Sequence, residues 1–179
     1  QDFSDWCGKT EVSYDIIAPA LAERLRTSVL RTEQTPATGV LPTLGHWCYF
    51  QAPAPADLLG EDGHPQRGGF LPPIALPRRM WAGGSLEFLA PIPIGATLSR
   101  HSTIGSMQAK EGRSGKLVFV SITHDYWQEE TKLITERQDL VFRDAAIKGN
   151  TASAKSKTTT LPPSEETPTP LHSQTLRGD

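Results

Sequence analysis

The chain has 179 residues, enough to bury one core, since single domains commonly run about 100–200 residues. Its formal net charge of −2 supplies no bulk basic field for a nucleic-acid backbone or an anionic membrane surface, so neither partner is expected. Fifteen Gly and fifteen Pro favour short elements joined by turns over a helical bundle. The composition therefore predicts one β-rich domain.

The cysteine content and the apolar runs of the sequence indicate the cellular compartment. Cys7 and Cys48 are too few for a disulfide scaffold and do not form a CxxC pair, so reduced thiols are expected. No apolar run approaches the roughly 20 residues that span a bilayer, and the N-terminus has no basic segment followed by an apolar one. We therefore expect an unexported, cytoplasmic protein, whose start at Gln1 suggests a processed or trimmed chain.

A helix is predicted over residues 15–31. Apolar side chains recur there at steps of four, at Ile17, Leu21, Leu25 and Val29. Asp15 or Ser13 can cap its exposed amide groups, and Pro19 is tolerated in a first turn. Residues 32–77 then predict a packed, irregular segment, with a short helix or strand around an aromatic knot: His46, Trp47, Tyr49 and Phe50.

Four strands are predicted after that segment, over residues 84–89, 97–106, 116–128 and 133–143. Turn-rich stretches separate them, which indicates an antiparallel meander. In the strand 116–128, both faces begin apolar and become polar, so its first half should be covered on both sides. From Ala145 to Asp179 there is no aromatic residue and Thr, Ser, Pro and Lys dominate, which predicts a tail or an interdomain linker.

Signatures of catalysis are missing from the sequence. It contains no GxSxG, no GxxxxGK[ST] and no HExxH, and we expect neither a cofactor nor a metal. Asp62-Gly63-His64 suits a turn, and His46 and His101 are interpreted as structural. The adjacent His124 and Asp125 cannot readily share a proton, because consecutive side chains on a strand point to opposite faces.

The segment from Phe70 to Gly84 is the most unusual. Three prolines restrict the backbone, and Arg78, Arg79 and Trp81 follow. A rigid, positively charged lip beside an aromatic wall suits an anionic ligand with an apolar body. The alternative is that both arginines pair with local carboxylates such as Glu87 and only hold the loop in place.

These residues carry a resemblance to a known family. The segments that carry it are HW (46–47), GEDGHP (60–65), GFLPP (69–73), LPRRMWAGG (76–84), KEGRSGKLVFV (110–120) and ERQDLVFR (136–143). Together they resemble the N-terminal domain of mesaconyl-CoA (methylfumaryl-CoA) hydratases and the related MaoC-like, FAS1-like dehydratase domains. The resemblance covers residues 5–144.

The resemblance implies an α+β hot-dog fold: a single domain, residues 1–144, in which a curled antiparallel sheet surrounds a long helix, followed by the tail or linker 145–179. It also implies reversible hydration of an enoyl thioester, in which an Asp and a His activate water and backbone amides polarise the thioester. In such hydratases the Asp and His lie in a motif similar to D-x-N-P-x-H in a second hot-dog unit. This sequence lacks that motif, and the chain ends where the second unit would begin.

No catalytic residue is therefore transferred from the family to this chain. A role in the substrate tunnel and pairing surface is implied for Gly69, Pro72, Arg78, Arg79, Met80, Trp81 and Gly83. The leading hypothesis is a hydratase/dehydratase subunit or half-enzyme for an acyl-CoA such as mesaconyl-CoA, with a second hot-dog unit as partner. A non-catalytic, homodimeric acyl-thioester-binding protein is the alternative. A thioesterase would share the fold, but no carboxylate motif on a helix supports it.

Overall fold

The computed structural model describes residues 3–29, 39–51, 53–60, 63–112 and 115–144, all within the compact unit Gln1–Ala146. The predicted tail from Ala145 onward lies outside the described residues, as does Asp62 of the predicted turn. No helix among the described residues is long and apolar enough to cross a membrane.

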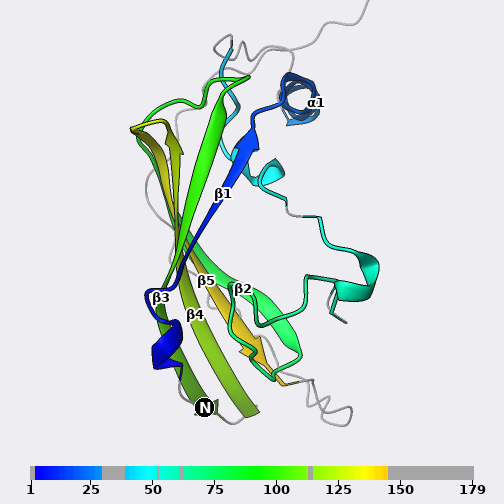
Figure 1. Ribbon diagram of the computed structural model, residues 1–179, viewed down its shortest axis with the longest axis vertical. Coiled ribbons are helices and arrows are strands. Elements are labelled where there is room, and N and C mark those ends of the chain that lie inside the picture. Colours follow the sequence, from blue (N-terminus) through cyan, green and yellow to red (C-terminus); the bar gives the residue numbers. More distant parts are fainter. Residues whose placement is uncertain (1–2, 30–38, 52, 61–62, 113–114, 145–179) are drawn as a thin grey trace, which may run out of the picture. The chain divides into compact units, whose positions relative to one another are not determined.

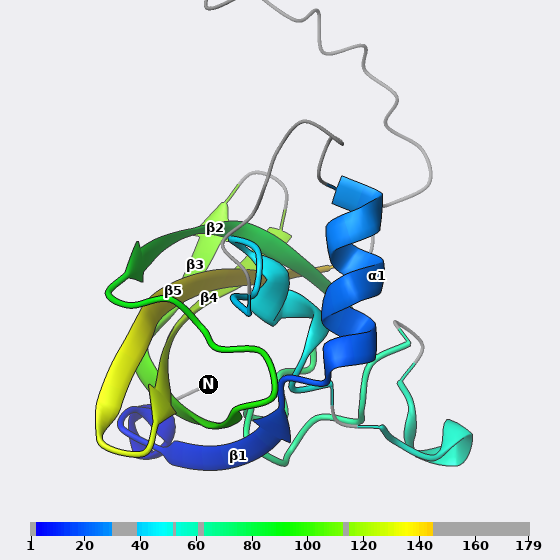
Figure 2. The same cartoon turned by 90° about the horizontal axis from the view of Figure 1, so that it is seen from above.

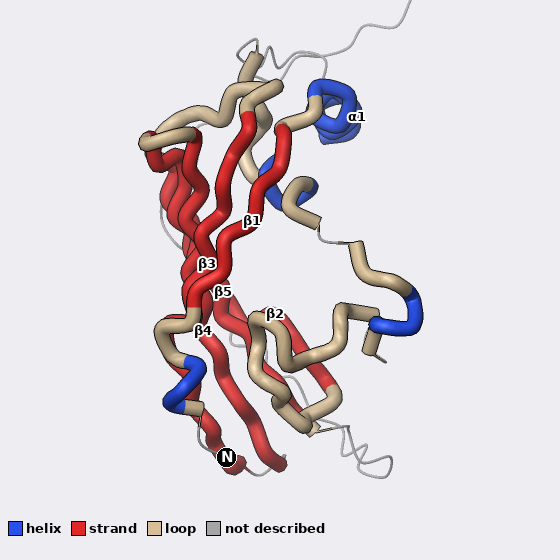
Figure 3. The backbone as a smooth tube through the Cα atoms, viewed as in Figure 1, coloured by secondary structure: helices blue, strands red, loops and turns tan. Residues whose placement is uncertain are grey.

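Five antiparallel strands form one sheet in the order β1-β3-β4-β5-β2 (Figures 1 and 3). The strands are β1 (Thr10–Ile16), β2 (Arg78–Phe88), β3 (Thr97–Gly112), β4 (Gly115–Gln128) and β5 (Thr131–Arg143). The sheet is strongly curled, and one α-helix, α1 (Pro19–Val29), lies on its concave side (Figure 2). The predicted curled sheet of the hot-dog fold is confirmed, and all four predicted strands are longer than expected.

The first of the five strands is absent from the sequence prediction. Residues 10–16 form β1, which pairs with β3 from Thr10↔Thr103 to Ile16↔Thr97. As a result, α1 begins at Pro19 and not at Asp15, and Pro19 occupies its first position, where the missing N–H costs nothing. The predicted cap at Asp15 is wrong, because its carboxylate accepts hydrogen bonds from the backbone N–H groups of Ile16 and Phe50 instead.

Short 3₁₀-helices interrupt the segment before β2: η2 (Gly45–Cys48) and η3 (Ala56–Leu58), with η1 (Ser4–Trp6) preceding β1. The predicted short helix at the aromatic knot is η2. The proline segment after η3 is held by Arg67, whose guanidinium donates to the carbonyl oxygens of Ile74, Leu76 and Pro77. This loop is therefore ordered by hydrogen bonds as well as by its prolines.

The core lies on the concave face in two clusters. One cluster gathers at the α1 end of the sheet: Ile17, Ala22, Leu41, Tyr49, Phe50, Ile92, Leu98, Tyr126, Leu133 and Ile134. The other gathers at the far end: Phe3, Ile74, Leu76, Ile104, Val118, Val120, Ile122, Leu140 and Phe142. Along β4, Val118, Val120 and Ile122 are buried, whereas Leu117 and Phe119 on the opposite face are only half-buried. The expectation that both faces would be covered is therefore met on one face only.

Candidate active site on the concave face

A band of polar side chains crosses the concave face between the two apolar clusters. Along three adjacent strands the inward-facing residues change from apolar to polar and back to apolar. We call the polar residues the polar belt: Arg100 and Ser102 of β3, His124 of β4, and Glu136 and Gln138 of β5. The register places Ser102 and Glu136 on either side of His124, so the belt is continuous across the sheet.

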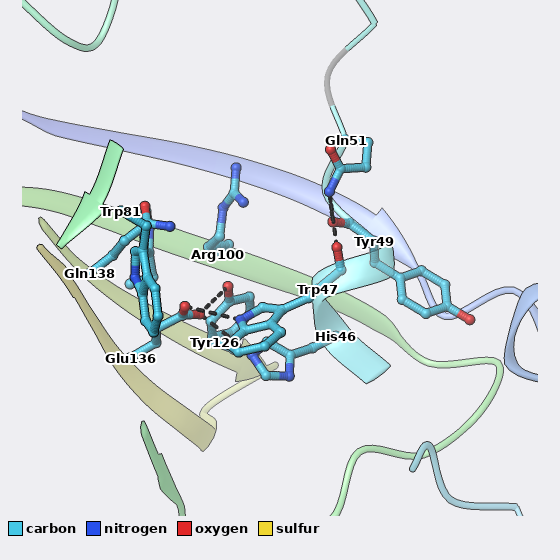
Figure 4. Close-up of a pocket in the computed structure, with 10 residues that line it drawn as sticks. His46, Trp47, Tyr49, Gln51, Trp81, Arg100, Tyr126, Glu136 and Gln138 are labelled. Atoms are coloured by element: carbon cyan, nitrogen blue, oxygen red, sulfur yellow. Dashed lines mark hydrogen bonds and ion pairs between the residues drawn. The ribbon is translucent and has the colours of Figure 1, made fainter. Parts of the chain in front are cut away.

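All of the polar belt except Ser102 lines one wall of a pocket of about 450 Å³, within the roughly 300–1,000 Å³ typical of small-molecule sites. The remaining lining residues come from η2, the loop after it, β2 and β4: His46, Trp47, Tyr49, Gln51, Trp81 and Tyr126. Figure 4 shows Trp81 and Gln138 near Glu136, with Arg100 on another part of the wall. Four strands and a 3₁₀-helix thus converge on one site.

Glu136 is the centre of the buried hydrogen bonds in this site. Its side chain accepts from Trp47 Nε1 at 3.0 Å and from the Tyr126 hydroxyl at 3.0 Å (Figure 4). His46 Nε2 lies 3.4 Å from the same carboxylate, close enough for electrostatic attraction but without hydrogen-bond geometry. Because Glu136 is only 6% exposed, losing these partners would leave a buried charge uncompensated.

Opposing effects set the pKa values around Glu136. Burial alone would raise the pKa of Glu136, but the polar contacts of His46, Tyr126 and Trp47 and the nearby His124 lower it below its ordinary value. Burial, with the charge of Glu136, raises the pKa of Tyr126, so its hydroxyl stays protonated and donates at neutral pH. Glu136 is therefore an ionised hydrogen-bond acceptor, and a weak base.

His124 differs from Glu136 in that its environment favours the neutral form. Its Nδ1 lies 2.8 Å from the Ser102 hydroxyl. Burial and the charge of Arg100 lower the pKa of His124, and the opposing effects of Glu136, Gln138 and Asp125 are smaller. Asp125 instead accepts from the Thr135 hydroxyl at 2.7 Å and pairs with Lys132 at 2.9 Å. The rejection of a His124–Asp125 dyad is confirmed by these separate partners.

The predicted ligand-binding segment is divided between loop and strand. Gly69 is exposed, and its carbonyl oxygen accepts from Lys9 at 2.6 Å; Pro72 is fully buried. Neither residue lines a described pocket. They lie away from the polar belt and support the fold of the loop.

The remaining predicted residues lie on β2, an edge strand of the sheet. Arg79 and Trp81 are opposite Phe142 and Leu140 of β5, so they share the concave face, whereas Arg78 and Met80 alternate to the other face. The expected lip of two adjacent arginines is therefore split between the two faces. Glu87 lies about 25 Å from Arg79 along the strand, too far to pair with it.

A β-bulge lies between Trp81 and Gly83, and Gly84 follows directly after it. A Cβ on Gly84 would lie 2.5 Å from the Arg137 carbonyl oxygen, so only glycine fits there. Bulges re-aim neighbouring side chains. Trp81 is 64% exposed and lines both the main pocket and a smaller one that also contains His64, Arg79 and Met80.

The sequence-based interpretation missed Arg100, Glu136, Gln138 and the partners of Glu136. His46 was correctly interpreted as packed, since it is 1% exposed and contacts the rings of Trp47, Phe88 and Tyr126. The sequence of β5 contains a signal for Glu136 and Gln138. These two polar residues share one face of the strand with three apolar ones, Ile134, Leu140 and Phe142. A carboxylate within an otherwise apolar face is the informative observation.

The surroundings of these polar residues show no metal site. Among the described residues, no group of three or more His, Cys, Asp or Glu side chains could hold a metal ion.

Comparisons with known proteins agree with this fold. Residues 44–177 match the family model of hydroxyacyl-thioester dehydratase type 2. The chain is 42% identical over 144 residues to the mesaconyl-C(4)-CoA hydratase of Chloroflexus aurantiacus, an alignment covering 80% of this chain and 51% of that protein. The chain thus spans about half the length of this curated relative.

Two solved structures share the fold at low sequence identity. The MaoC-like dehydratase from Rhodospirillum rubrum is 13% identical with a TM-score of 0.52, covering 79% of this chain and 94% of that one. A chain of the ChsH1–ChsH2 complex from Mycobacterium tuberculosis is 11% identical with a TM-score of 0.51, covering 77% and 89%. The chain belongs to the hot-dog family of hydroxyacyl-thioester dehydratases and hydratases.

Proposed function

We propose that this chain is one half of a hydro-lyase that hydrates an enoyl-CoA thioester such as mesaconyl-CoA. In this proposal it shapes the acyl site, and a second hot-dog unit supplies the catalytic Asp and His. The observation that carries the proposal is the 42% identity to a mesaconyl-C(4)-CoA hydratase, together with coverage of only 51% of that protein. The sequence here contains no D-x-N-P-x-H.

The chemistry of the pocket supports a catalytic group from elsewhere. The carboxylate nearest a histidine is Glu136, but its oxygens already accept from Trp47 and Tyr126. Its lowered pKa makes it a poor general base at neutral pH, where the best catalysts have pKa values near the working pH. The carboxylate of the pocket therefore contributes a fixed negative charge and hydrogen-bond acceptors, and is not tuned for proton transfer at neutral pH.

Strand β2 is the proposed surface for pairing and acyl contact. It is an edge strand, and within the described residues only β5 pairs with it, so another strand could be added at its other side. Arg79 and Trp81 face the concave side near the pocket, which suits the acyl thioester, and Arg78 and Met80 face outward. Gly83 forms the bulge, while Gly69 and Pro72 would act indirectly through the loop.

A reconstitution experiment tests this proposal. The chain is used as bait, and the captured material is assayed for mesaconyl-CoA hydration and sequenced for a unit that carries D-x-N-P-x-H. We expect turnover by the pair, and loss of turnover when the Asp or His of that motif is replaced by Ala. Turnover that persists in those variants would contradict the division of roles.

The alternative is an acyl-thioester-binding protein without catalysis, favoured by the lowered pKa of Glu136, which makes the carboxylate of the described pocket a poor general base. It predicts saturable binding of acyl-CoA in calorimetry without turnover in any combination, with binding weakened by Arg78→Ala or Arg79→Ala. Absence of acyl-CoA binding, with or without a partner unit, would contradict both functions.

A further inference from the structure

Among the described residues that line the main pocket, Arg100 is the only arginine or lysine. It lies on the concave face of β3, opposite Tyr126 of β4 and Ser13 of β1. Within the part of the chain that the structure describes, no carboxylate lies within ion-pair distance of its guanidinium. A half-buried cation without a paired anion is uncommon, because burying a charge is costly unless it is compensated.

Neighbouring side chains hold Arg100 in position. Its guanidinium carbon lies 5.1 Å from the centre of the Phe50 ring, a distance suited to a cation–π contact. Phe50 adopts φ 60°, a left-handed conformation that is unusual for a bulky residue. The Asp15 carboxylate stabilises this conformation by accepting from the Phe50 backbone N–H at 2.7 Å. Residues with strained backbone conformations are found disproportionately at ligand-binding sites, where they hold neighbouring side chains in the position needed for binding.

The other charges of the pocket do not neutralise Arg100 directly. Glu136 already accepts two hydrogen bonds from the wall and lies beyond 4 Å from the guanidinium. His124 is kept neutral at pH 7 by burial and by the charge of Arg100 itself. The Arg100 side of the pocket is therefore positively charged.

Polar atoms without partners lie on the same wall. The Arg100 Nε and the Ser13 hydroxyl are buried and have no hydrogen-bond partner among the described residues. Buried polar groups are almost always hydrogen-bonded, so the Arg100 Nε and the Ser13 hydroxyl leave hydrogen-bonding capacity for a polar ligand group on this wall.

We infer that Arg100 binds a free carboxylate at the far end of the acyl group, so that the site selects monothioesters of dicarboxylic acids. A guanidinium presents donors in a planar fork that matches a carboxylate. The apolar part of the acyl group would lie along Trp81 and Tyr126, which line the same pocket. The inference rests on the proposed function, because it assumes that the pocket binds an acyl-CoA thioester. The contact between Arg100 and the carboxylate can nevertheless be measured by binding alone, without turnover.

The test compares two thioesters that share CoA and differ at the distal end of the acyl group: mesaconyl-CoA, which ends in a carboxylate, and crotonyl-CoA, which ends in a methyl group. Dissociation constants are measured by calorimetry on the full chain paired with a D-x-N-P-x-H unit whose Asp and His are replaced by Ala. Arg100→Met should weaken mesaconyl-CoA binding about 10- to 100-fold, the range for a hydrogen bond to a charged group. Crotonyl-CoA binding should change less than about threefold.

Two further variants complete the test. Arg100→Lys keeps the charge, loses the fork, and should give an intermediate loss for mesaconyl-CoA. Arg137→Met, on the opposite face of β5, should bind both thioesters as the parent does. Equal weakening of both thioesters by Arg100→Met would show that Arg100 binds a CoA phosphate or only supports the fold, and would overturn the inference.

Failure of the proposed function would give a distinguishable result. If the pair bound mesaconyl-CoA in an Arg100-dependent way but the pair with an intact motif did not hydrate it, the hydro-lyase proposal would fail and the carboxylate contact would stand. If the parent and Arg100→Met hydrated mesaconyl-CoA and crotonyl-CoA at the same ratio of rates, the carboxylate contact would be overturned and the hydro-lyase proposal would stand.

Discussion

The two halves of the concave face are built from the same three strands and yet differ in chemistry. At the far end, β3, β4 and β5 contribute Ile104, Val120, Leu140 and their neighbours to a wholly apolar cluster. Toward α1, the same strands present the polar belt and its pocket, followed by the second apolar cluster with Leu98, Tyr126 and Ile134. Burying polar groups costs free energy unless they are hydrogen-bonded, so the second half is stabilised by hydrogen bonds as well as packing. The difference separates the part that stabilises the fold from the part that is available for binding.

The largest expected effect is on the apolar half. Phe142 is fully buried, and Phe142→Ala should lower the free energy of unfolding by about 3–5 kcal/mol through lost burial and the cavity that remains. Urea denaturation measures the change. The control is Tyr14→Ala on β1, where the side chain is 73% exposed and the expected change is within about 0.5 kcal/mol. Similar losses in both variants would contradict the burial of Phe142.

A smaller effect is expected at the centre of the polar half. Glu136→Gln places an amide NH₂ among the donors Trp47 Nε1 and Tyr126 OH, and should cost about 1–3 kcal/mol of stability. A double-mutant cycle with Tyr126→Phe measures their coupling, expected at roughly 0.5 kcal/mol or more. If the two losses add without coupling, the hydrogen bond between these side chains contributes no stability.

The same half should give the protein a pH-dependent stability. The folded state lowers the pKa of His124 from its ordinary value of 6.5, so the unfolded chain binds more protons and stability falls as the pH drops below that value. Glu136, with a lowered pKa, contributes stability that is lost as the pH falls below about 4.5. Unfolding free energies measured from pH 8 to pH 4 should therefore decline in two stages.

His124→Gln identifies the first of these stages. The variant cannot titrate, so its stability should be flatter than that of the parent between pH 7 and pH 5, while the decline below pH 4.5 remains. An unchanged first stage in the variant would mean that another group causes it.

The smallest effect on stability is expected at Trp81. Because Trp81 is largely exposed, Trp81→Phe should change the free energy of unfolding by less than about 0.5 kcal/mol. Trp47→Phe removes the donor to Glu136 and should cost about 1 kcal/mol. Thermal or urea unfolding of both variants shows which substitution lowers the free energy of unfolding more. A larger loss for Trp81→Phe than for Trp47→Phe would mean that Trp81 on β2, and not Trp47, stabilises the fold.

The strands were predictable from sequence because alternation and turn residues mark them directly. The strands from residue 97 onward follow that pattern closely, and the β4–β5 turn falls at Glu129 and Glu130, within the predicted loop. Strand β1 was missed because its apolar residues Val12, Tyr14 and Ile16 lie on the exposed face, whereas its half-buried inner face carries the polar Ser13 and Asp15. The helix prediction extended into it for the same reason.

The site was less predictable than the fold. Arg100, His124 and Glu136 lie on three separate strands, and only the register of the sheet brings them together. The predicted residues from Arg78 to Gly83 were interpreted as a loop because the prolines before them end at Pro77, yet pairing with β5 extends the strand back to Arg78. Local sequence describes neither the bulge after Trp81 nor the contact between Trp47 and Glu136, 89 residues apart.

The rate of mesaconyl-CoA hydration by the purified chain alone tests most directly whether the pocket holds an acyl group without performing the chemistry. We predict no hydrated product above the uncatalysed rate, and product once a unit carrying D-x-N-P-x-H is added. Hydration by the chain alone at the rate of the complete pair would contradict this division and would transfer the catalytic role to the polar belt itself.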